Sequence, residues 1–426
     1  MTARRSVAVV GSGVAGLTAA YVLRRTHEVT LFESDDRIGG HAHTHDLTTA
    51  SGRPVAVDTG FIVHNERTYP ILRRLFDELG VATQETEMSL SVRCDGCGLE
   101  YSGGQGFSGI APSMRVAARP RYLRMLTEVA RFHRHARSVL AAGATDNEPT
   151  LGEFLHAGHY SPYFVAHFMT PVVAAVWSCG PTTALQYPAR YLFTFLDNHS
   201  MLSVSGSPTW RTVVGGSRTY VDLAVKELTA VRTSTPIRSV TRTPSGGPGS
   251  RIEIRDDADR VSAFDAMIVA THPDQALRLL GDATAAEREA LGSFEYSINP
   301  TVLHTDTSVL PTNHRAQASW NYRMGSCGDR ADQVEVTYDM TRLQRLDTDE
   351  RYLVSLNSSG VDPESVIDTM VYHHPQYTPT SVAAQALLPS LNDGVTAFAG
   401  AYHGWGFHED GARSGLAAAE SLGGAW

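Results

Sequence analysis

Positive charge and long apolar runs are scarce in this sequence of 426 residues. Lysine and arginine together number 36 against 45 aspartates and glutamates, and the net charge is −9. A protein that binds nucleic acid needs a basic face, so this balance excludes nucleic acid as the expected partner. No run approaches the roughly 18 to 20 apolar residues of a membrane-spanning helix. The chain opens directly on an apolar strand, so we expect no signal peptide and a cytoplasmic protein.

Cysteine is equally scarce, with four residues in the whole chain. One pair, Cys94-Asp-Gly-Cys97, has a spacing that occurs in zinc sites. Zinc needs four ligands, and one such pair does not supply them. Asp95-Gly96 is a favoured hairpin turn, so we interpret the segment as a turn that happens to carry cysteines. We therefore expect no metal site.

The most informative stretch lies near the start of the chain. An apolar strand runs into Gly11, Gly13 and Gly16, an amphipathic helix follows, and a second strand ends on Glu33. This is a G-x-G-x-x-G motif in a β-α-β unit, with an acidic residue at the expected distance. The three glycines allow, in order, a tight turn, close approach of a pyrophosphate, and close packing of helix and strand. Glu33 suits a ribose diol and would repel a 2′-phosphate, so we predict a dinucleotide site other than NADP.

Two further segments point to the same ligand. Arg37-Ile-Gly39-Gly40 follows the second strand, where the chain would pass back over the diphosphate. Residues 396–420 read as a strand, a glycine-rich loop and a helix, with Asp410 and Gly411 near the helix start. A second formal glycine motif at residues 104–109 lacks a preceding apolar strand and is followed by prolines, so we reject it as a nucleotide site.

Residues 113–140 form the one strongly basic stretch, in which seven arginines between positions 115 and 137 accompany a single acid, Glu128. The pattern favours a solvated helix face over the core. The alternative is peripheral contact with anionic lipid headgroups through residues 115–137.

The segments 11–33, 37–44, 210–217 and 398–418 together resemble the superfamily of flavin-containing amine oxidases, protoporphyrinogen oxidases and phytoene desaturases. Residues 58–70 and 407–415 resemble a bacterial subgroup of predicted NAD/FAD-binding oxidoreductases, whose members often accompany cyclopropane fatty-acyl-phospholipid synthases. The resemblance implies an α/β fold, with a Rossmann-like FAD-binding domain of the glutathione-reductase type and an inserted α+β substrate domain. We expect the FAD-binding domain to comprise residues 1–80, 201–272 and 380–426, and the substrate domain residues 81–200 and 273–379.

The resemblance implies FAD as the cofactor. The residues expected to bind it are Gly11, Gly13, Val14, Ala15, Gly16, Glu33, Arg37, Gly39, Gly40, His41, Ile237, Gly400, Asp410, Gly411 and Ala412. The backbone of Ile237 would meet the adenine, and Asp410, Gly411 and Ala412 would lie by the ribityl chain and the flavin ring. His41 and His43 raise the alternative of a covalent histidyl link, but ordinary non-covalent FAD is favoured.

The chain also departs from the amine oxidase pattern. Amine oxidases usually have an arginine where His41 stands and an acid where Ala401 stands. They also have a lysine near the flavin N5, at a position that corresponds to about Pro300 here. The only lysine is Lys226, on the helix that follows Gly216, where it cannot fill that role. These differences argue against amine oxidation and favour chemistry at carbon.

We therefore predict an FAD-dependent oxidoreductase that takes hydride from a C–H or CH–CH unit of an apolar, lipid or fatty-acyl substrate. Candidate catalytic residues are Tyr402, His403 and Trp405, and, with less support, Trp320, Tyr322 and His304. With no second nucleotide unit, O₂ or an external acceptor is expected to reoxidise the flavin. Two alternatives stay open: a flavin-dependent double-bond isomerase with no net redox change, and a non-catalytic flavin- or lipid-binding partner of a lipid-modifying enzyme.

Overall fold

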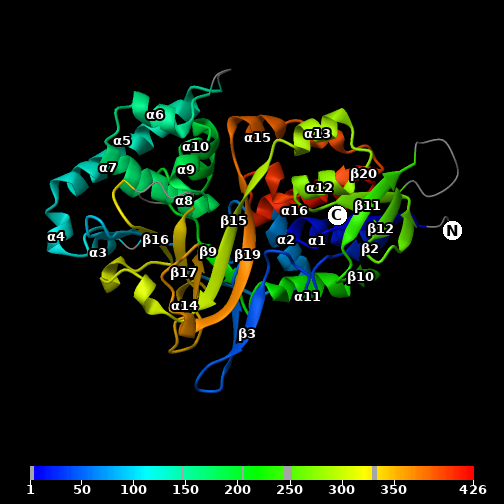
Figure 1. The fold of residues 1–426 in the computed structure, drawn as a ribbon, viewed down its shortest axis with the longest axis horizontal. Helices are drawn as coiled ribbons and strands as arrows, with labels where there is room; N and C mark the ends of the chain where they lie inside the picture. The colour runs from blue at the N-terminus through cyan, green and yellow to red at the C-terminus, as the bar shows by residue number, and fades with distance from the viewer. Residues whose placement is uncertain (1–3, 105, 145–147, 204–205, 244–251, 329–332) are drawn as a thin grey trace.

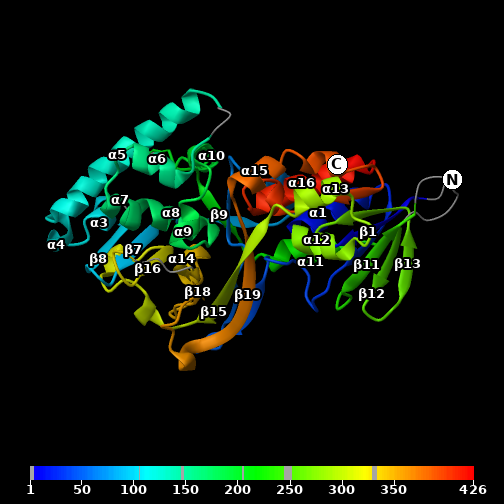
Figure 2. The same cartoon turned by 45° about the horizontal axis from the view of Figure 1, so that its top comes forward.

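The computed structural model describes residues 1–426 except 1–3, 105, 145–147, 204–205, 244–251 and 329–332. Two parts lie side by side, and the long strands β15 (Glu295–His304) and β19 (Val366–Gln376) run between them (Figures 1 and 2). One part holds both chain ends. The other carries most of the green and cyan helices, and the two parts meet around a large cavity described below.

The part that holds the chain ends is built on a parallel sheet in the order β10-β2-β1-β14-β20. Its strands are β10 (Ala230–Arg232), β2 (Glu28–Phe32), β1 (Ser6–Val10), β14 (Ala266–Val269) and β20 (Thr396–Phe398). All four residues of β14 are buried, as expected for a strand covered on both faces. The helices of this part are α1 (Val14–Leu23), α2 (Pro70–Leu79), α11 (Arg218–Lys226), α12 (Pro273–Leu279), α13 (Ala285–Leu291), α15 (Pro379–Ala384) and α16 (His408–Ser421).

Three small sheets accompany the parallel sheet. They are β11 (Ile237–Arg242) with β12 (Ile252–Asp256) and β13 (Val261–Phe264), β3 (Thr44–Thr48) with β4 (Pro54–Asp58), and β5 (Val63–Asn65) with β9 (Trp210–Val213) and β6 (Thr83–Glu85). The sequence predicts a helix over residues 65–80, but helix α2 begins only at Pro70. The difference arises because Asn65 ends β5, and its side chain accepts hydrogen bonds from the backbone N–H groups of Arg67 and Thr68.

The other part is built on a seven-stranded sheet in the order β19-β15-β18-β17-β16-β7-β8. Its remaining strands are β18 (Leu353–Leu356), β17 (Glu335–Asp339), β16 (Trp320–Met324), β7 (Leu90–Cys94) and β8 (Leu99–Gly103). The pairing is antiparallel except between β16 and β7. Its helices are α3 (Phe107–Ile110), α4 (Met114–Ala117), α5 (Pro120–Ala141), α6 (Leu151–Ala157), α7 (Pro162–Phe164), α8 (Thr170–Trp177), α9 (Pro181–Ala184), α10 (Ala189–Asn198) and α14 (Met340–Leu343), with a π-helix at Val165–Met169.

Each part has its own hydrophobic core. Aromatic residues of α5 to α10 pack in one cluster with β7, β8 and β16, and α1, α2, α11 and α16 pack in a second cluster around β1 and β2. Helices α12 and α13 pack with β14 and Phe398 in a third cluster, on the side of the parallel sheet. These two helices therefore pack against the part that holds the chain ends. The sequence-based boundary at residue 272 assigns them to the substrate domain, and the domain boundaries stay a prediction. None of the described helices is long and apolar enough to cross a membrane.

The basic segment forms helix α5, which begins at Pro120. Several of its arginines already have partners within the chain. Arg124 and Arg131 lie 3.6 and 3.9 Å from Glu128 Oε1, and Arg137 donates a hydrogen bond to the Leu202 carbonyl. These contacts agree with a helix face that packs over its own core. Peripheral membrane contact through residues 115–137 stays a prediction.

Candidate active site

One cavity of about 1290 Å³ is lined by residues of both parts of the chain. It exceeds the roughly 300 to 1,000 Å³ that is typical of small-molecule sites. Its wall begins at the end of β1 and the start of α1, and it extends to the apolar helices α5, α8 and α10. The volume leaves room for a dinucleotide at one end and a substrate at the other.

The glycines of the first motif differ in what surrounds them. A Cβ atom on Gly11, where φ is +102°, would lie 2.7 Å from the Ala270 carbonyl oxygen, and one on Gly16 would lie 1.9 Å from the Gly11 carbonyl oxygen. A Cβ atom on Gly13 would meet nothing within 4 Å, and Gly13 lines the cavity. Gly11 and Gly16 thus satisfy packing, whereas Gly13 leaves an open surface at the N-terminus of α1. This surface fits the diphosphate of a dinucleotide.

The end of β2 presents Glu33 to the same cavity. One carboxylate oxygen of Glu33 accepts hydrogen bonds from the backbone N–H and the hydroxyl of Ser12, at 3.0 and 2.5 Å. The other accepts from the Ser34 hydroxyl and the Asp35 backbone N–H, both at 3.0 Å. These donors fix the carboxylate next to the glycine turn. Ile237 also lines this end of the cavity, so Glu33 and Ile237 together mark the predicted adenosine end.

Arg37 has a different immediate role from the one predicted. Its guanidinium donates a 2.7 Å hydrogen bond to the Gly40 carbonyl, which folds the loop after β2 back on itself. A Cβ atom on Gly40 would lie 3.1 Å from Gly13 Cα, so this loop lies directly over the glycine motif. Arg37 and Gly40 both line the cavity, which leaves their predicted diphosphate contacts in place as predictions.

The structure divides the predicted cofactor residues into two groups. Those that line the cavity are Gly11, Gly13, Val14, Ala15, Glu33, Arg37, Gly40, His41, Ile237 and Gly400. Those that lie outside its lining are Gly16, Gly39, Asp410, Gly411 and Ala412. Gly39 lies in the loop over the motif, where a Cβ atom would be 2.7 Å from the Ala42 carbonyl oxygen.

At the start of α16, Asp410 and Gly411 make contacts within the chain, and their predicted place beside the ribityl chain and the flavin ring stays a prediction. Asp410 accepts hydrogen bonds from the Phe407 backbone at 3.0 Å and from the Arg413 guanidinium at 2.6 Å, so its carboxylate caps its own helix. Burial raises the pKa of Asp410 to about 6. A Cβ atom on Gly411 would lie 2.6 Å from Val14 Cγ1, so this glycine serves the crossing of α16 over α1. The residues here that line the cavity are Phe407 and His408.

Two of the three catalytic candidates line the cavity. Tyr402 and Trp405 do so, and His403 does not. The Tyr402 hydroxyl and His403 Nε2 are buried and have no hydrogen-bond partner among the described residues. Burial lowers the pKa of His403 to about 4, so its imidazole is neutral at physiological pH. The indole N–H of Trp177 donates a 2.9 Å hydrogen bond to the Trp405 carbonyl, which holds this loop against α8.

Of the three catalytic candidates with less support, one lines the cavity and two do not. Trp320 lines the cavity, and its indole N–H is buried without a partner in the described part of the chain. Tyr322 is buried in the helical core and lies outside the cavity lining. His304 is fully buried away from the cavity, where its Nε2 lies 2.8 Å from the Ser355 hydroxyl and its Nδ1 accepts from the Asp306 backbone. For Tyr322 and His304 this placement favours a structural role.

His41, a predicted cofactor residue, lies in a cluster of aromatic and imidazole rings in the cavity wall whose other members sequence reasoning missed. The His41 ring lies 5.0 Å from Tyr372 and 5.4 Å from His374, and the His272 ring stacks on Tyr296 at 4.1 Å. All five residues line the cavity. Burial lowers the pKa of His272 and His374 to about 4, and lowers that of His41 well below its usual value. The only signal in the sequence is the spacing of Tyr372 and His374, which puts them on one face of β19.

The far end of the cavity is a chamber of apolar side chains from α5, α8, α10 and the π-helix. Its lining includes Met125, Leu126, Val129, Phe132, Phe168, Met169, Val172, Val176, Trp177, Phe195 and Leu196. Among the described lining residues the carboxylates are Glu33 and Asp35, both at the end of β2. The described residues of the chamber wall therefore offer no carboxylate as a counter-charge for a cationic substrate.

Comparison with known proteins identifies the family of the chain. The family of flavin containing amine oxidoreductases matches residues 14–311. The chain belongs to this family. A putative flavin-containing monoamine oxidase of Mycobacterium tuberculosis is 27% identical over 256 residues, 56% of this chain and 52% of that protein. A carotenoid phi-ring synthase of Streptomyces griseus is 26% identical over 297 residues, 65% of this chain and 54% of that protein.

Solved structures of this fold cover the chain more fully. Putrescine oxidase bound to putrescine superimposes with a TM-score of 0.67 at 16% identity, over 98% of this chain and 99% of that one. A fatty acid isomerase from P. acnes that produces CLA superimposes with a TM-score of 0.68 at 16% identity, over 96% and 97% of the two chains. The likeness at this identity concerns the fold alone.

Membership of the family confirms the predicted superfamily, the α/β fold with an FAD-binding domain, the oxidoreductase class and the cofactor FAD. The open surface at Gly13 and the carboxylate at the end of β2 are consistent with that cofactor. The chain spans about half the length of the curated relatives that it matches over the longest stretches. The substrate and the activity of the whole protein are therefore matters for proposal.

Proposed function

We propose that this chain is an FAD-dependent oxidoreductase that takes hydride from a C–H or CH–CH unit of an apolar substrate, of the lipid or fatty-acyl class. The observation that carries the proposal is the apolar chamber, which continues from the nucleotide end of one cavity and has no carboxylate among its described lining residues. An alkyl chain gains favourable free energy from such a wall. An alkylammonium ion would lose its hydration there without a partner.

The protein contributes orientation and the exclusion of water. When bound, FAD supplies a two-electron acceptor. Gly13 and the N-terminus of α1 would hold its diphosphate, and Glu33 its ribose. Trp405 and Phe407 line the cavity, where they can place a substrate carbon and keep water out. The neighbouring imidazoles of His41 and His374 are neutral at physiological pH and can exchange hydrogen bonds without adding charge.

An anaerobic bleaching assay tests this proposal. The FAD-loaded protein is mixed with unsaturated and saturated fatty acids, with phospholipid vesicles, and separately with putrescine and longer primary amines. We expect one of the lipid substrates to bleach the visible flavin absorbance and the amines to leave it unchanged. Bleaching by amines with none by lipids would overturn the proposal. An isomerase would convert the lipid anaerobically with no net bleaching, and a non-catalytic partner would do neither.

A narrowed chamber gives a second test. Val172 lines the cavity on α8, and a V172F variant would fill part of the chamber. We expect the apparent affinity for the longest bleaching substrate to fall about tenfold, which corresponds to roughly 1.4 kcal/mol. The matched control is V214F, because Val214 is 45% exposed and lies outside the cavity lining. Equal behaviour of the two variants would place the substrate elsewhere.

Electron transfer out of the flavin is part of the same proposal. Of the two formal glycine motifs, we assign only that of residues 11–16, which lies in a β-α-β unit, to a dinucleotide, so we propose that O₂ or an external acceptor reoxidises the cofactor. Rapid anaerobic bleaching by NADH would contradict this. The predicted association with cyclopropane fatty-acyl-phospholipid synthases suggests which lipids to include in the assay. They are the products of these synthases, phospholipids with modified acyl chains.

A further inference from the structure

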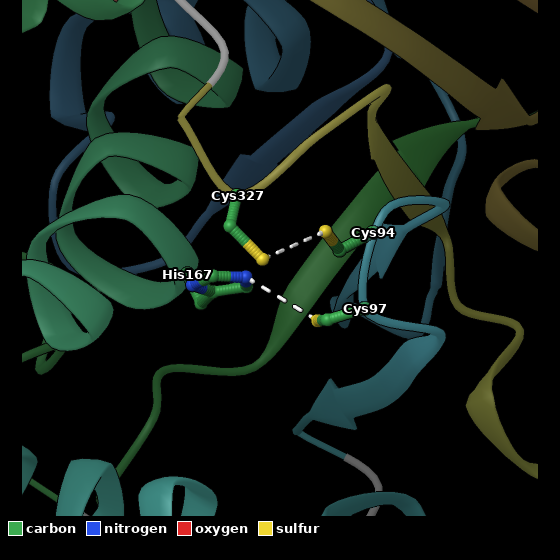
Figure 3. A group of neighbouring side chains, drawn as sticks. All are labelled: Cys94, Cys97, His167 and Cys327. Carbon is green, nitrogen blue, oxygen red and sulfur yellow. Dashed lines mark hydrogen bonds between the residues drawn. The ribbon is translucent and has the colours of Figure 1, made fainter.

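Away from the cavity lining, three cysteines and a histidine converge on one point. Cys94 ends β7, Cys97 lies in the turn before β8, Cys327 follows β16, and His167 lies in the π-helix (Figure 3). One ligand atom from each residue lies within 4.8 Å of those from the other three. We propose that this cluster, here called the Cys3His cluster, binds a zinc ion that has a structural role.

Two of the distances between ligand atoms match those of a tetrahedral zinc site, and the others lie within 4.8 Å. The sulfur atoms of Cys94 and Cys327 are 3.8 Å apart, and the sulfur of Cys97 is 3.6 Å from His167 Nε2. Zinc–sulfur and zinc–nitrogen bonds of about 2.3 and 2.0 to 2.1 Å place two sulfurs about 3.8 Å apart, and a sulfur and a nitrogen about 3.6 Å apart. A disulfide would need its sulfurs about 2.05 Å apart, so the pair is not bonded.

The histidine is oriented as a metal ligand would be. His167 is fully buried, and its Nδ1 lies 3.1 Å from the Tyr163 carbonyl oxygen. If Nδ1 carries the proton, it donates to that carbonyl, and Nε2 presents its lone pair to the sulfurs. A hydrogen bond of this kind on the second ring nitrogen is what usually fixes a metal-binding histidine. The Tyr163 ring also stacks on the imidazole at 4.0 Å.

The two turns that carry the cysteines fit each other closely. A Cβ atom on Gly96 would lie 2.9 Å from Ser326 Cα, so the turn after β7 packs on the loop after β16. The Asp95 backbone N–H also donates to the Met324 carbonyl. The parallel pairing of β16 with β7 sets Met324 opposite Cys94, which brings the two loops together at one end of the sheet.

Charge around the Cys3His cluster also suits zinc. Three thiolates, a neutral imidazole and Zn²⁺ carry a net charge of about −1. The guanidinium of Arg119 donates a 3.0 Å hydrogen bond to the Cys97 carbonyl, and Arg121 acts electrostatically on Cys327. Sulfur-rich donor sets select zinc over magnesium or calcium, and four protein ligands leave no open position for catalysis.

The cluster has a clear structural task. It would join the β7–β8 hairpin, the end of β16 and the π-helix, which are distant in sequence. The residues that follow His167 in the π-helix, Phe168 and Met169, line the apolar chamber, as do Val92 of β7 and Tyr101 of β8. Zinc would therefore stabilise the segments that carry these lining residues. The sequence-based expectation of no metal considered only the Cys94–Cys97 pair and had no means to find the other two ligands.

Metal analysis of the FAD-loaded full chain, produced in zinc-supplemented medium, tests the proposal independently of any activity. We expect about one zinc per chain in the wild type and in C179A, whose buried thiol lies outside the cluster. In C97S and C327S the zinc content should fall to about a tenth or less. Zinc-free wild type with four titratable thiols, or with a Cys94–Cys327 disulfide, would overturn the proposal.

A spectroscopic test on the wild type covers the case in which the variants fail to fold. Protein grown with cobalt in place of zinc should show the intense visible bands of tetrahedral Co²⁺ and thiolate charge-transfer bands. A mercurial thiol reagent should release about one metal ion per chain as the cluster cysteines react. Bands typical of octahedral cobalt, or thiol modification without metal release, would overturn the assignment. Neither readout depends on the proposed substrate.

Discussion

At the scale of single residues, glycines of the same motif are needed for different reasons, backbone packing at Gly16 and ligand access at Gly13. Gly16 is required because any side chain would collide with the backbone of Gly11, whereas Gly13 faces open space in the cavity. A substitution at Gly16 therefore acts on folding, and one at Gly13 acts on the ligand. The two effects can be separated by experiment.

We predict that G13A weakens FAD binding by about tenfold or more, because the added methyl occupies the surface that the diphosphate approaches. The unfolding midpoint of the cofactor-free protein should stay near that of the wild type. G16A should lower that midpoint strongly, since its Cβ would lie 1.9 Å from a carbonyl oxygen. Flavin fluorescence titration and thermal unfolding measure the two effects.

The matched control is G281A, because a Cβ atom on Gly281 also meets nothing within 4 Å and this residue lies outside the cavity lining. Its FAD affinity should equal that of the wild type. If G13A bound FAD as tightly as G281A, the diphosphate would have to lie elsewhere in the cavity.

At the scale of elements, the loop between β20 and α16 is held in place by Gln385, a residue outside this loop. The side-chain amide of Gln385, just after α15, donates hydrogen bonds to the carbonyls of Tyr402 and Gly404 at 2.9 and 2.7 Å. The same carbonyl of Gly404 accepts from the Tyr191 hydroxyl at 2.7 Å. Gln385 thus positions the segment that carries Tyr402 and Trp405.

We predict that Q385A slows substrate-dependent flavin bleaching by roughly tenfold, because a loop that shifts by a fraction of an ångström misplaces its reacting partners. FAD content and substrate affinity should change much less. Stopped-flow bleaching at several substrate concentrations separates the rate from the affinity. S390A, an exposed substitution a few residues away, serves as the control. An unchanged rate in Q385A would show that the loop is held without this amide.

At the scale of elements, local segments can be predicted from the sequence, whereas contacts between distant segments cannot. The β1–α1–β2 unit, the hairpin at residues 89–103 and the helix after Pro120 follow from local patterns of apolar spacing, turns and proline. The contact of Cys94 with Cys327 joins residues 233 positions apart, and that of Cys97 with His167 joins residues 70 apart. His41 likewise meets His374 only through the fold. Such contacts depend on strand order and helix packing, for which a single sequence carries no local signal.

At the scale of the whole molecule, the histidines whose pKa is lowered by burial outnumber the acids whose pKa is raised by it. Burial lowers the pKa of seven histidines to about 4: His43, His64, His133, His272, His304, His374 and His403. It lowers that of His408 further, to about 3. Burial raises the pKa of Asp58 and Asp410 to about 6 and that of Glu409 to about 7. The two groups make opposite contributions to the pH dependence of stability.

The sign follows from proton counting. Between about pH 6.5 and pH 4 the unfolded chain protonates these histidines and the folded chain does not, so their stabilising contribution is complete above pH 6.5 and is lost as the pH falls. The three acids contribute most below about pH 4, and that contribution is lost as the pH rises through 6 to 7. Because the histidines are more numerous, we predict a net loss of stability on acidification.

Urea unfolding of the cofactor-free protein at pH 7.5, 6.5 and 5.5 measures this prediction. The free energy of unfolding should fall over this series, with the steepest part below pH 6.5, by about 1.4 kcal/mol per pH unit for each net proton taken up. H408Q removes the histidine with the lowest of the numerical pKa values, so its stability should depend less steeply on pH than that of the wild type. Stability that is constant or rises toward pH 5.5 would mean that the histidines take up their protons in the folded state.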